Sequence, residues 1–306
     1  MKHDTMTSRS FLQRGVTLIE LMIALAIGLL IVLVITSAYM SGIGAQRAQT
    51  DLTRLEESAR FGFDLVSRSV RRAGFRDTLS TYSDLYAGPI AQEICGADPA
   101  VGPSIRATND LSTVDLGGGV VANIHNKSDS LTVRYYGQDN PDNTGPDGVV
   151  LDCLGNAVRR GTLVQDTIYV AADPANNNEP SLFCSTDNPA VVNPADRNLA
   201  LIPGVESLQL LYAEDTDGDT VTNRYAPANK VSVWDDVRGV LVSLIVRTTQ
   251  ATGSDRLAKT FKHFGDDYDA AANADAEGGT YSGAADGRVR LQFANFMSLR
   301  NFPVCK

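Results

Sequence analysis

The chain has 306 residues and a formal net charge of −9. This length is enough for one or two domains with a substantial core. The acidic balance argues against binding to nucleic-acid phosphates, so we expect no direct nucleic-acid binding. No Cys-x-x-Cys pair occurs, and the 3 histidines are scattered, which argues against a zinc site.

The first predicted element is a membrane-spanning helix. Residues 21–35 contain no charge, and their Leu, Ile and Val side chains are worth roughly −3 to −7 kcal/mol of insertion free energy. Residues 18–39 reach the ~20 residues that span a bilayer. Lys2, Arg9 and Arg14 precede the helix and predict a cytoplasmic N-terminus, with the rest of the chain outside the inner membrane.

A carboxylate, Glu20, directly precedes the apolar run and lies five residues after Gly15. An ionised side chain beside a hydrocarbon segment is costly, up to about 3 kcal/mol, and usually marks function. Residues 15–20, Gly-Val-Thr-Leu-Ile-Glu, resemble the type IV prepilin signature. The resemblance implies that prepilin peptidase cleaves after Gly15, that Val16 becomes the N-methylated N-terminus, and that Glu20 guides subunit assembly. The family more often has phenylalanine at the position of Val16.

Two other interpretations of this segment stay open. A secretory signal peptide would be cut after small residues near 36–38, and a plain anchor would keep Met1. The signal-peptide interpretation gives Glu20 no purpose, so we favour the prepilin interpretation. Removal of residues 1–15, which carry three basic side chains and one acidic side chain, would leave a net charge of −11.

The helical pattern continues beyond the membrane segment. Apolar residues recur at steps of three and four, which gives one apolar stripe. These residues are Leu52, Leu55, Ala59, Phe63, Val66 and Val70. Gly74 suits the position just past a helix C-terminus. We therefore predict a helix over residues 16 to about 73, roughly 85 Å long.

After residue 74 the hydrophobic period changes to two, which predicts strands. The predicted strands are residues 131–135, 167–171, 205–212, 240–246 and 288–293. Long polar loops are predicted at residues 139–148, 173–180, 215–223 and 265–287. No further long amphipathic helix is apparent, so we predict an α+β protein with an antiparallel sheet. The expected division is a leader at 1–15, a helix at 16–74 and a β-rich head at 75–306.

The four cysteines, Cys95, Cys153, Cys184 and Cys305, all follow the membrane segment. An even number in an oxidising compartment favours two disulfides over buried free thiols. Four cysteines allow three pairings. We favour Cys153 with Cys184, because they bracket a predicted hairpin, and Cys95 with Cys305, which would tie down the C-terminal tail.

An acidic loop carries Asp215, Asp217 and Asp219 at alternate positions. Alternate carboxylates in a tight loop can direct oxygens at one hard cation. Thr220 and Ala226 occupy the positions where an EF-hand loop needs glycine and glutamate. We therefore expect no required cofactor, and a calcium site with a Kd of about 10⁻⁴–10⁻³ M, with a solvated turn as the alternative.

Enzyme chemistry finds little support in the sequence. No nucleophile elbow, H-E-x-x-H motif or phosphate-binding loop is present. Residues 117–119, Gly-Gly-Gly, lack the lysine of a phosphate loop and suit a turn. His125 and His263 are far apart in sequence, and each is more often a structural residue than a catalyst. We therefore predict that the protein is not an enzyme.

Three scattered segments, residues 71–75, 152–156 and 205–219, resemble the PilW-like minor pilins. The resemblance implies a long helix packed on a β-sheet head, and a low-abundance subunit that primes or tips a type IV pilus. Its partners would be prepilin peptidase, other minor and major pilins, and the inner membrane before assembly. It would then reach the cell surface in the pilus, where twitching motility, adhesion and DNA uptake are properties of the filament.

Other functions share these features. A minor pseudopilin of type II secretion would have the same signature and helix. A membrane-anchored adhesin or calcium-dependent binding module would use the helix only as an anchor, and an enzyme on a membrane stalk is the weakest alternative. A head as large as residues 75–306 is bulky for a subunit repeated along a shaft, which favours the tip or priming role.

Overall fold

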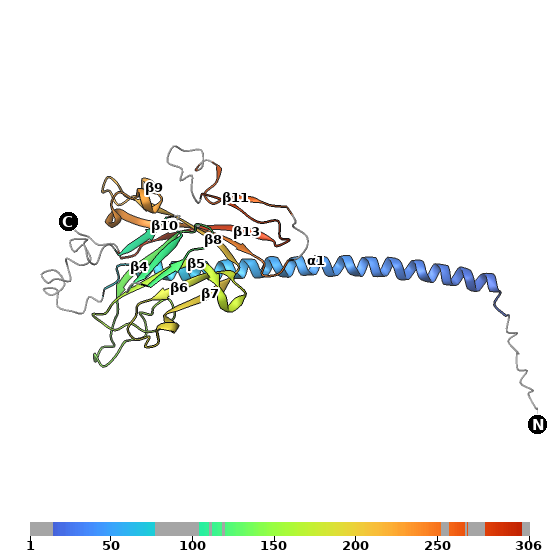
Figure 1. Cartoon of the computed structure of the whole chain (residues 1–306), viewed down its shortest axis with the longest axis horizontal. Helices are drawn as coiled ribbons and strands as arrows, with labels where there is room; N and C mark the ends of the chain where they lie inside the picture. Colours follow the sequence, from blue (N-terminus) through green and yellow to red (C-terminus); the bar gives the residue numbers. More distant parts are fainter. Residues whose placement is uncertain are drawn as a thin grey trace, which may run out of the picture. The chain divides into compact units, whose positions relative to one another are not determined.

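The computed structural model describes residues 15–76, 104–109, 112–117, 120–251, 257–266, 268 and 279–301 (Figure 1). The chain divides into two units, Met1–Thr50 and Asp51–Lys306, which are described separately. Helix α1 (Leu18–Arg72) contributes residues to both units. It agrees with the predicted helix to within two residues at either end.

The first unit consists of the N-terminal part of α1. Residues Leu18–Ile43 have a mean hydropathy of 3.1 in an 18-residue window, none of it buried, so the segment is long and apolar enough to cross a membrane. The Glu20 N–H donates to Thr17 Oγ1 at 3.3 Å, as in a helix N-cap. Glu20 also lies in the first turn, where the helix dipole favours a negative charge.

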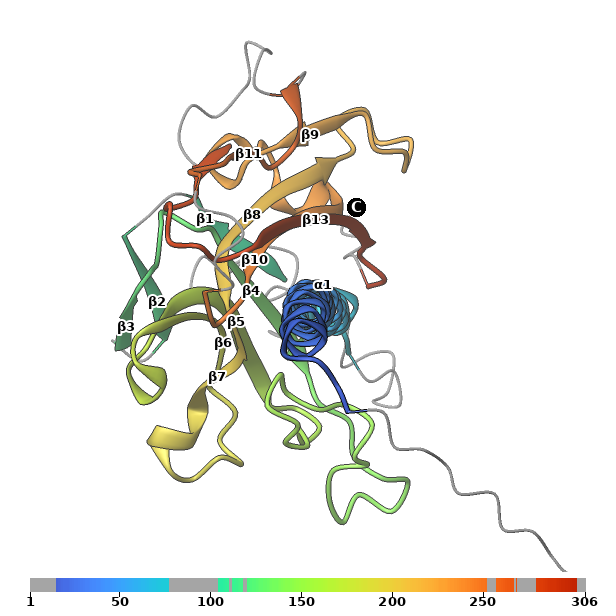
Figure 2. The same ribbon diagram turned by 90° about the vertical axis from the view of Figure 1, so that its right-hand side faces the viewer.

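The second unit contains a five-stranded sheet in the order β1-β4-β5-β6-β7 (Figure 2). Its strands are β1 (Ile105–Thr108), β4 (Ser130–Tyr136), β5 (Leu163–Asp173), β6 (Glu179–Thr186) and β7 (Asn198–Pro203). A second sheet has four strands in the order β13-β10-β8-β9. Its strands are β8 (Val205–Glu214), β9 (Arg224–Ala226), β10 (Val237–Arg247) and β13 (Arg290–Ser298).

Two short ribbons complete the described strands. The first pairs β2 (Thr113–Gly117) with β3 (Val120–Asn123), and the second pairs β11 (Thr260–Lys262) with β12 (Thr280–Ser282). Every pairing between described strands is antiparallel. The prediction of an α+β protein with antiparallel sheets is therefore confirmed.

The main core of this unit lies between the C-terminal part of α1 and the two sheets. Leu55, Ala59, Val66 and Val70 are buried, as the predicted stripe requires, whereas Leu52 is 41% exposed. Gly62 marks the closest approach of the helix. A Cβ at this position would lie 3.2 Å from Leu244 Cδ1 of β10 and 3.4 Å from Ile202 Cδ1 of β7.

The end of α1 follows the predicted pattern. Gly74 has a φ of +72°, a left-handed conformation that favours glycine. Its N–H donates to the Arg134 carbonyl at 2.8 Å. The Asn301 side-chain amide donates to the Arg71 carbonyl at 2.9 Å. The helix end is therefore held by β4 and by the segment after β13.

A charged cluster joins the two sheets. Arg247 of β10 contacts Glu179 of β6 at 2.9 Å and Glu206 of β8 at 2.6 Å. Arg290 of β13 also contacts Glu206 at 2.6 Å, and Arg288 contacts Glu179 at 2.8 Å. Buried ion pairs of this kind fix relative positions more reliably than they add stability. The cluster therefore sets how β6 meets β8, β10 and β13.

Two loop predictions need correction. The predicted loop 265–287 contains a strand, β12, which pairs with β11. The predicted loop 173–180 is a short connection, because Asp173 caps a 3₁₀ turn at Pro174–Asn176 and β6 begins at Glu179. β6 itself was not predicted, because all its residues are buried and no polar face alternates with an apolar one. Gly118 and Gly119 of the predicted turn lie outside the described residues.

Candidate functional site

The N-terminal site consists of Gly15, Val16 and Glu20. Gly15 and Val16 precede α1, and the Val16 side chain is 70% exposed. Glu20 is exposed and makes no ion pair with any described residue. An unpaired carboxylate at the start of an apolar helix can bind a cation supplied by another molecule. The expected cation is the α-amino group that cleavage frees at the N-terminus of a neighbouring subunit.

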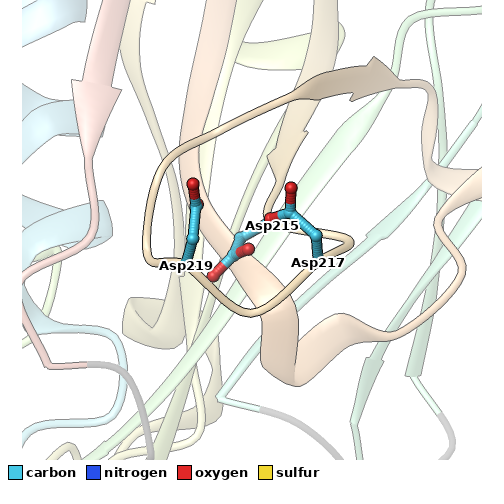
Figure 3. A group of neighbouring side chains, drawn as sticks. All are labelled: Asp215, Asp217 and Asp219. Atoms are coloured by element: carbon cyan, nitrogen blue, oxygen red, sulfur yellow. The ribbon is translucent and has the colours of Figure 1, made fainter.

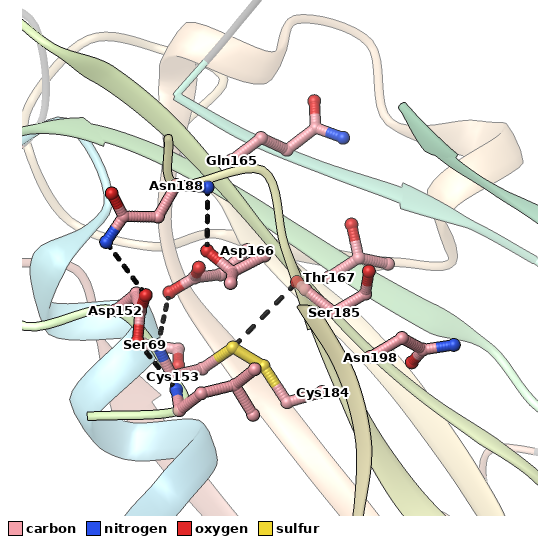
Figure 4. Close-up of a disulfide and its surroundings, with 12 residues drawn as sticks. Ser69, Asp152, Cys153, Gln165, Asp166, Thr167, Cys184, Ser185, Asn188 and Asn198 are labelled. Atoms are coloured by element: carbon pink, nitrogen blue, oxygen red, sulfur yellow. Dashed lines mark hydrogen bonds between the residues drawn. A yellow bond between two sulfur atoms is a disulfide. The ribbon is translucent and has the colours of Figure 1, made fainter. Parts of the chain in front are cut away.

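The cysteine prediction is supported for one pair. Cys184 of β6 forms a disulfide with Cys153, which lies in the loop before β5, and their Cα atoms are 6.3 Å apart (Figure 4). Both side chains are buried. The other pair, Cys95 with Cys305, lies outside the described residues and stays a prediction.

A buried carboxylate, Asp166, organises the surroundings of this disulfide (Figure 4). It accepts hydrogen bonds from the Cys153 N–H at 2.9 Å and the Tyr135 hydroxyl at 2.7 Å. Arg72, in the last turn of α1, lies 3.5 Å away. Burial raises the pKa of Asp166 to about 6 despite these partners. The sequence carries no signal for this role, because the partners come from distant segments.

The segment 152–156, noted for its resemblance, forms a turn. Asp152 Oδ1 accepts from the N–H groups of Leu154 at 2.9 Å and Asn156 at 2.8 Å. Its Oδ2 accepts from the Asn188 side chain at 2.9 Å. The segment therefore positions the disulfide loop and has no exposed chemistry of its own.

The acidic loop brings Asp215, Asp217 and Asp219 together, with candidate ligand oxygens within 4.8 Å of one another (Figure 3). Asp215 is buried and already has partners: it accepts from the Gly218 and Thr220 N–H groups at 2.8 and 3.0 Å. Arg238 also contacts it at 3.1 Å. Arg238 thus supplies positive charge where a cation would bind. Asp217 and Asp219 are exposed, so they would have to hold most of any calcium ion.

The two described histidines, His125 and His263, have separate structural settings. His263 is buried, with Nδ1 2.9 Å from Ser243 Oγ and Nε2 3.0 Å from Ser207 Oγ. In a neutral imidazole one nitrogen donates and the other accepts, so both serines can be satisfied. Burial lowers the pKa of His263 to about 3, which keeps the ring neutral. His125 follows β3 and donates its backbone N–H to the Val170 carbonyl.

Two family models match separate parts of the chain. Residues 11–36 match the prokaryotic N-terminal methylation motif, which includes Gly15, Val16 and Glu20. Residues 167–301 match a model described as type IV pilus-assembly protein W. This second match runs from within β5 to just beyond β13, so it includes strands of both sheets.

A type IV-like pilin from Thermus thermophilus is similar at 13% identity with a TM-score of 0.41, covering 81% of this chain and 98% of that chain. No curated protein matches the chain. Pilins are structural proteins, which agrees with the prediction that the chain is not an enzyme. In two separate parts the chain is therefore similar to type IV pilus proteins: its N-terminus matches the methylation motif, and residues 167–301 match the PilW family of type IV pilus-assembly proteins.

Proposed function

We propose that the protein is a minor pilin that primes assembly of a type IV pilus or occupies its tip, together with other minor and major pilins. The observation that carries the proposal is the combination of two features. Glu20 lies within a methylation motif and has no ion-pair partner among the described residues, and residues 167–301 of the head match the PilW family. The large two-sheet head supports the tip or priming role, because a shaft would have to accommodate it at every repeat.

The proposal includes a route to the cell surface. The apolar part of α1 first holds the chain in the inner membrane, with the basic leader in the cytoplasm and the head in the periplasm. Prepilin peptidase removes residues 1–15, and Val16 becomes the N-terminus. The same helix then enters the filament. Twitching motility, adhesion and DNA uptake follow as properties of the pilus.

A minor pseudopilin of type II secretion is the nearest alternative, because the methylation motif is the same. Deletion of the gene, with surface pili and secreted exoproteins scored side by side, separates the two. We expect loss of pili with normal secretion, restored by the full-length chain. Normal pili with lost secretion would assign the protein to the secretion system. If both are normal, the helix is only an anchor for an adhesin or a calcium-dependent binding module.

A further inference from the structure

Strand β13 is an open border of the second sheet (Figure 2). It pairs with β10 through nine consecutive residues without a register shift. The Val289 carbonyl accepts from the Thr248 N–H, and the Leu299 N–H donates to the Arg238 carbonyl, so the backbone N–H and C=O groups of the odd-numbered residues point toward β10. The N–H and C=O groups of Ala294, Phe296 and Ser298 therefore point away from β10. No described residue bonds to these backbone groups.

In the part of the chain that the structure describes, this border lacks the usual protection of an edge strand. Natural edges are short, bulged, charged or interrupted by proline. Among the described edge strands, β9 has three residues, β1 has four, and β7 pairs with a register shift and ends at Pro203. β13 has nine residues, and its only charged residue is Arg290, which is committed to the ion cluster. Residues 291–298 contain neither a charge nor a proline.

A groove of about 540 Å³ runs beside this border, between β13 and α1. Phe63 of α1 and Phe293 of β13 supply much of its apolar lining, and Glu56, Glu57 and Arg60 supply charge. The Phe293 side chain lines this groove together with α1 residues, so it lies on the face of the sheet that meets the helix. A strand added to β13 would therefore direct alternate side chains into this groove.

The opposite face of the border carries an aromatic pair. Phe296 is 44% exposed and Tyr225 of β9 is 48% exposed, with their rings edge to face at 6.3 Å between centroids. The Phe296 ring lies over Gly239 of β10, on the inner side of the border, so an added strand would meet only the outer side of this residue. The groove face of the border thus offers the main apolar contact, beside backbone groups to which no described residue bonds.

We propose that β13 receives an extended segment from a neighbouring, different subunit of the same pilus. This inference rests on the proposed function. The segment adds a strand through the backbone groups of Ala294, Phe296 and Ser298, as in β-strand addition. It directs an apolar side chain against Phe63 and Phe293. A basic side chain points toward Glu56 and Glu57, because the two carboxylates leave the groove with an excess negative charge beside the single Arg60. A second copy of β13 fits less well, because its residues 291–298 carry no basic side chain.

One variant and one control position test the border without breaking the sheet. Ala294→Pro removes an N–H that faces outward and places a ring in the path of the added strand, while the ladder to β10 keeps its donors. Val192 is 88% exposed in a loop before β7 and serves as the matched surface position. Thermal unfolding of the detergent-solubilised full-length chain should confirm that Ala294→Pro folds as the wild type does.

The experiment replaces Asn295, which is exposed and lines the groove, with the photo-crosslinking residue benzoylphenylalanine in full-length protein in piliated cells. We expect a crosslink to an extended segment of another pilus subunit, identified by peptide mapping. Ala294→Pro should reduce the crosslink yield at least about tenfold, which corresponds to a loss of about 1.4 kcal/mol of binding free energy. Benzoylphenylalanine in place of Val192 should give no crosslink to another pilus subunit.

Three results would overturn the inference: no crosslink, a crosslink only to a second copy, or one that Ala294→Pro leaves unchanged. A crosslink to a secretion-system subunit that Ala294→Pro abolishes would overturn the proposed pilus function while supporting strand addition. If folded Ala294→Pro also lowers the number of surface pili, the added strand contributes to assembly. Unchanged pilus number together with an unchanged crosslink would count against both the border and its role.

Discussion

Glu20 has no cationic partner among the described residues, although it lies at the start of an apolar helix. A carboxylate in a low dielectric gains strongly from a nearby cation. We predict that Glu20→Leu is still cleaved after Gly15 and inserted, yet is absent from filaments, because it lacks a partner for the amine of a neighbouring subunit. N-terminal mass spectrometry of the membrane fraction and immunoblotting of sheared pili measure the two steps.

Glu20→Gln separates the effect of charge from that of shape, since it keeps the shape of the side chain and removes only the charge. It should fail in assembly as Glu20→Leu does. Recovery of either variant in sheared pili at the wild-type level would contradict the assembly role. A mature chain that begins near Tyr39, or one that keeps Met1, would contradict the prepilin interpretation itself.

The burial of His263 predicts that the stability of the head falls in acid. Its pKa is lowered from 6.5 to about 3 by burial, so the unfolded chain binds the proton more readily. The stabilising contribution is present above pH 6.5 and is lost as the pH falls toward 3. The full shift corresponds to at most roughly 5 kcal/mol. We predict that the melting temperature falls between pH 6.5 and 4, and that His263→Gln is less stable at pH 7 but falls less on acidification.

Asp166 acts in the opposite direction. Its pKa is raised from 3.8 to about 6 by burial, so acidification relieves a penalty over that range. The difference between wild type and His263→Gln therefore isolates the histidine, because both chains contain Asp166. Parallel pH profiles for the two chains would show that His263 does not supply the acid sensitivity.

At the scale of single elements, the fit of α1 depends on Gly62. Any larger side chain there would meet Leu244 and Ile202, which belong to different sheets. We predict that Gly62→Leu destabilises the protein by about 1–3 kcal/mol, despite leucine's higher helix propensity. Gly145, where a Cβ would meet no atom within 4 Å, is the matched control. Thermal unfolding of both variants measures the difference, and equal melting temperatures would contradict the tight approach.

The loop after β8 tests the calcium prediction. Asp217 and Asp219 are exposed, and a divalent cation would relieve their mutual repulsion. We predict that millimolar calcium raises the melting temperature, whereas sodium at matched ionic strength does not. The double variant Asp217→Ala, Asp219→Ala should lose the response. Asp215 stays unchanged because its carboxylate caps the loop. The same response in wild type and double variant would identify a solvated turn.

The predictability of each element follows from its burial pattern. α1 could be predicted because one face is apolar and Gly74 ends it. The central strands β8 and β10 were found from their apolar and alternating residues. β13 was predicted only in part, because exposed Ala294, Asn295 and Phe296 interrupt its pattern. β6 is buried throughout, and short strands such as β12 depend on tertiary contacts, so their sequences carry no periodic signal.

The candidate site divides in the same way. Gly15, Val16 and Glu20 could be recognised because their signal is local in sequence. The Asp166 cluster and the buried His263 could not, because their partners come from separate strands. Proximity of the three loop aspartates was predictable from spacing alone, whereas the contact between Asp215 and Arg238 required the fold.

On the scale of the whole molecule, the two cysteine pairs would link distant parts of the head. We predict that all four cysteines are oxidised, with Cys95 bonded to Cys305, and that each bridge adds roughly 2–4 kcal/mol. Alkylation without reductant followed by peptide mapping tests the oxidation state and the pairing. Labelling of Cys153 and Cys184 would contradict the observed bridge, and a mixed pairing would contradict only the connectivity.

The burial of α1 residues 51–72 against two sheets has a mechanical consequence. A pulling force directed along this stretch of helix acts parallel to its contacts with the sheets. Leu55, Ala59, Val66 and Val70 would then have to slip together, in shear, instead of separating one after another as a peeling force would make them. Close packing makes such a collective slip costly. The head is therefore attached in the geometry that best resists axial tension.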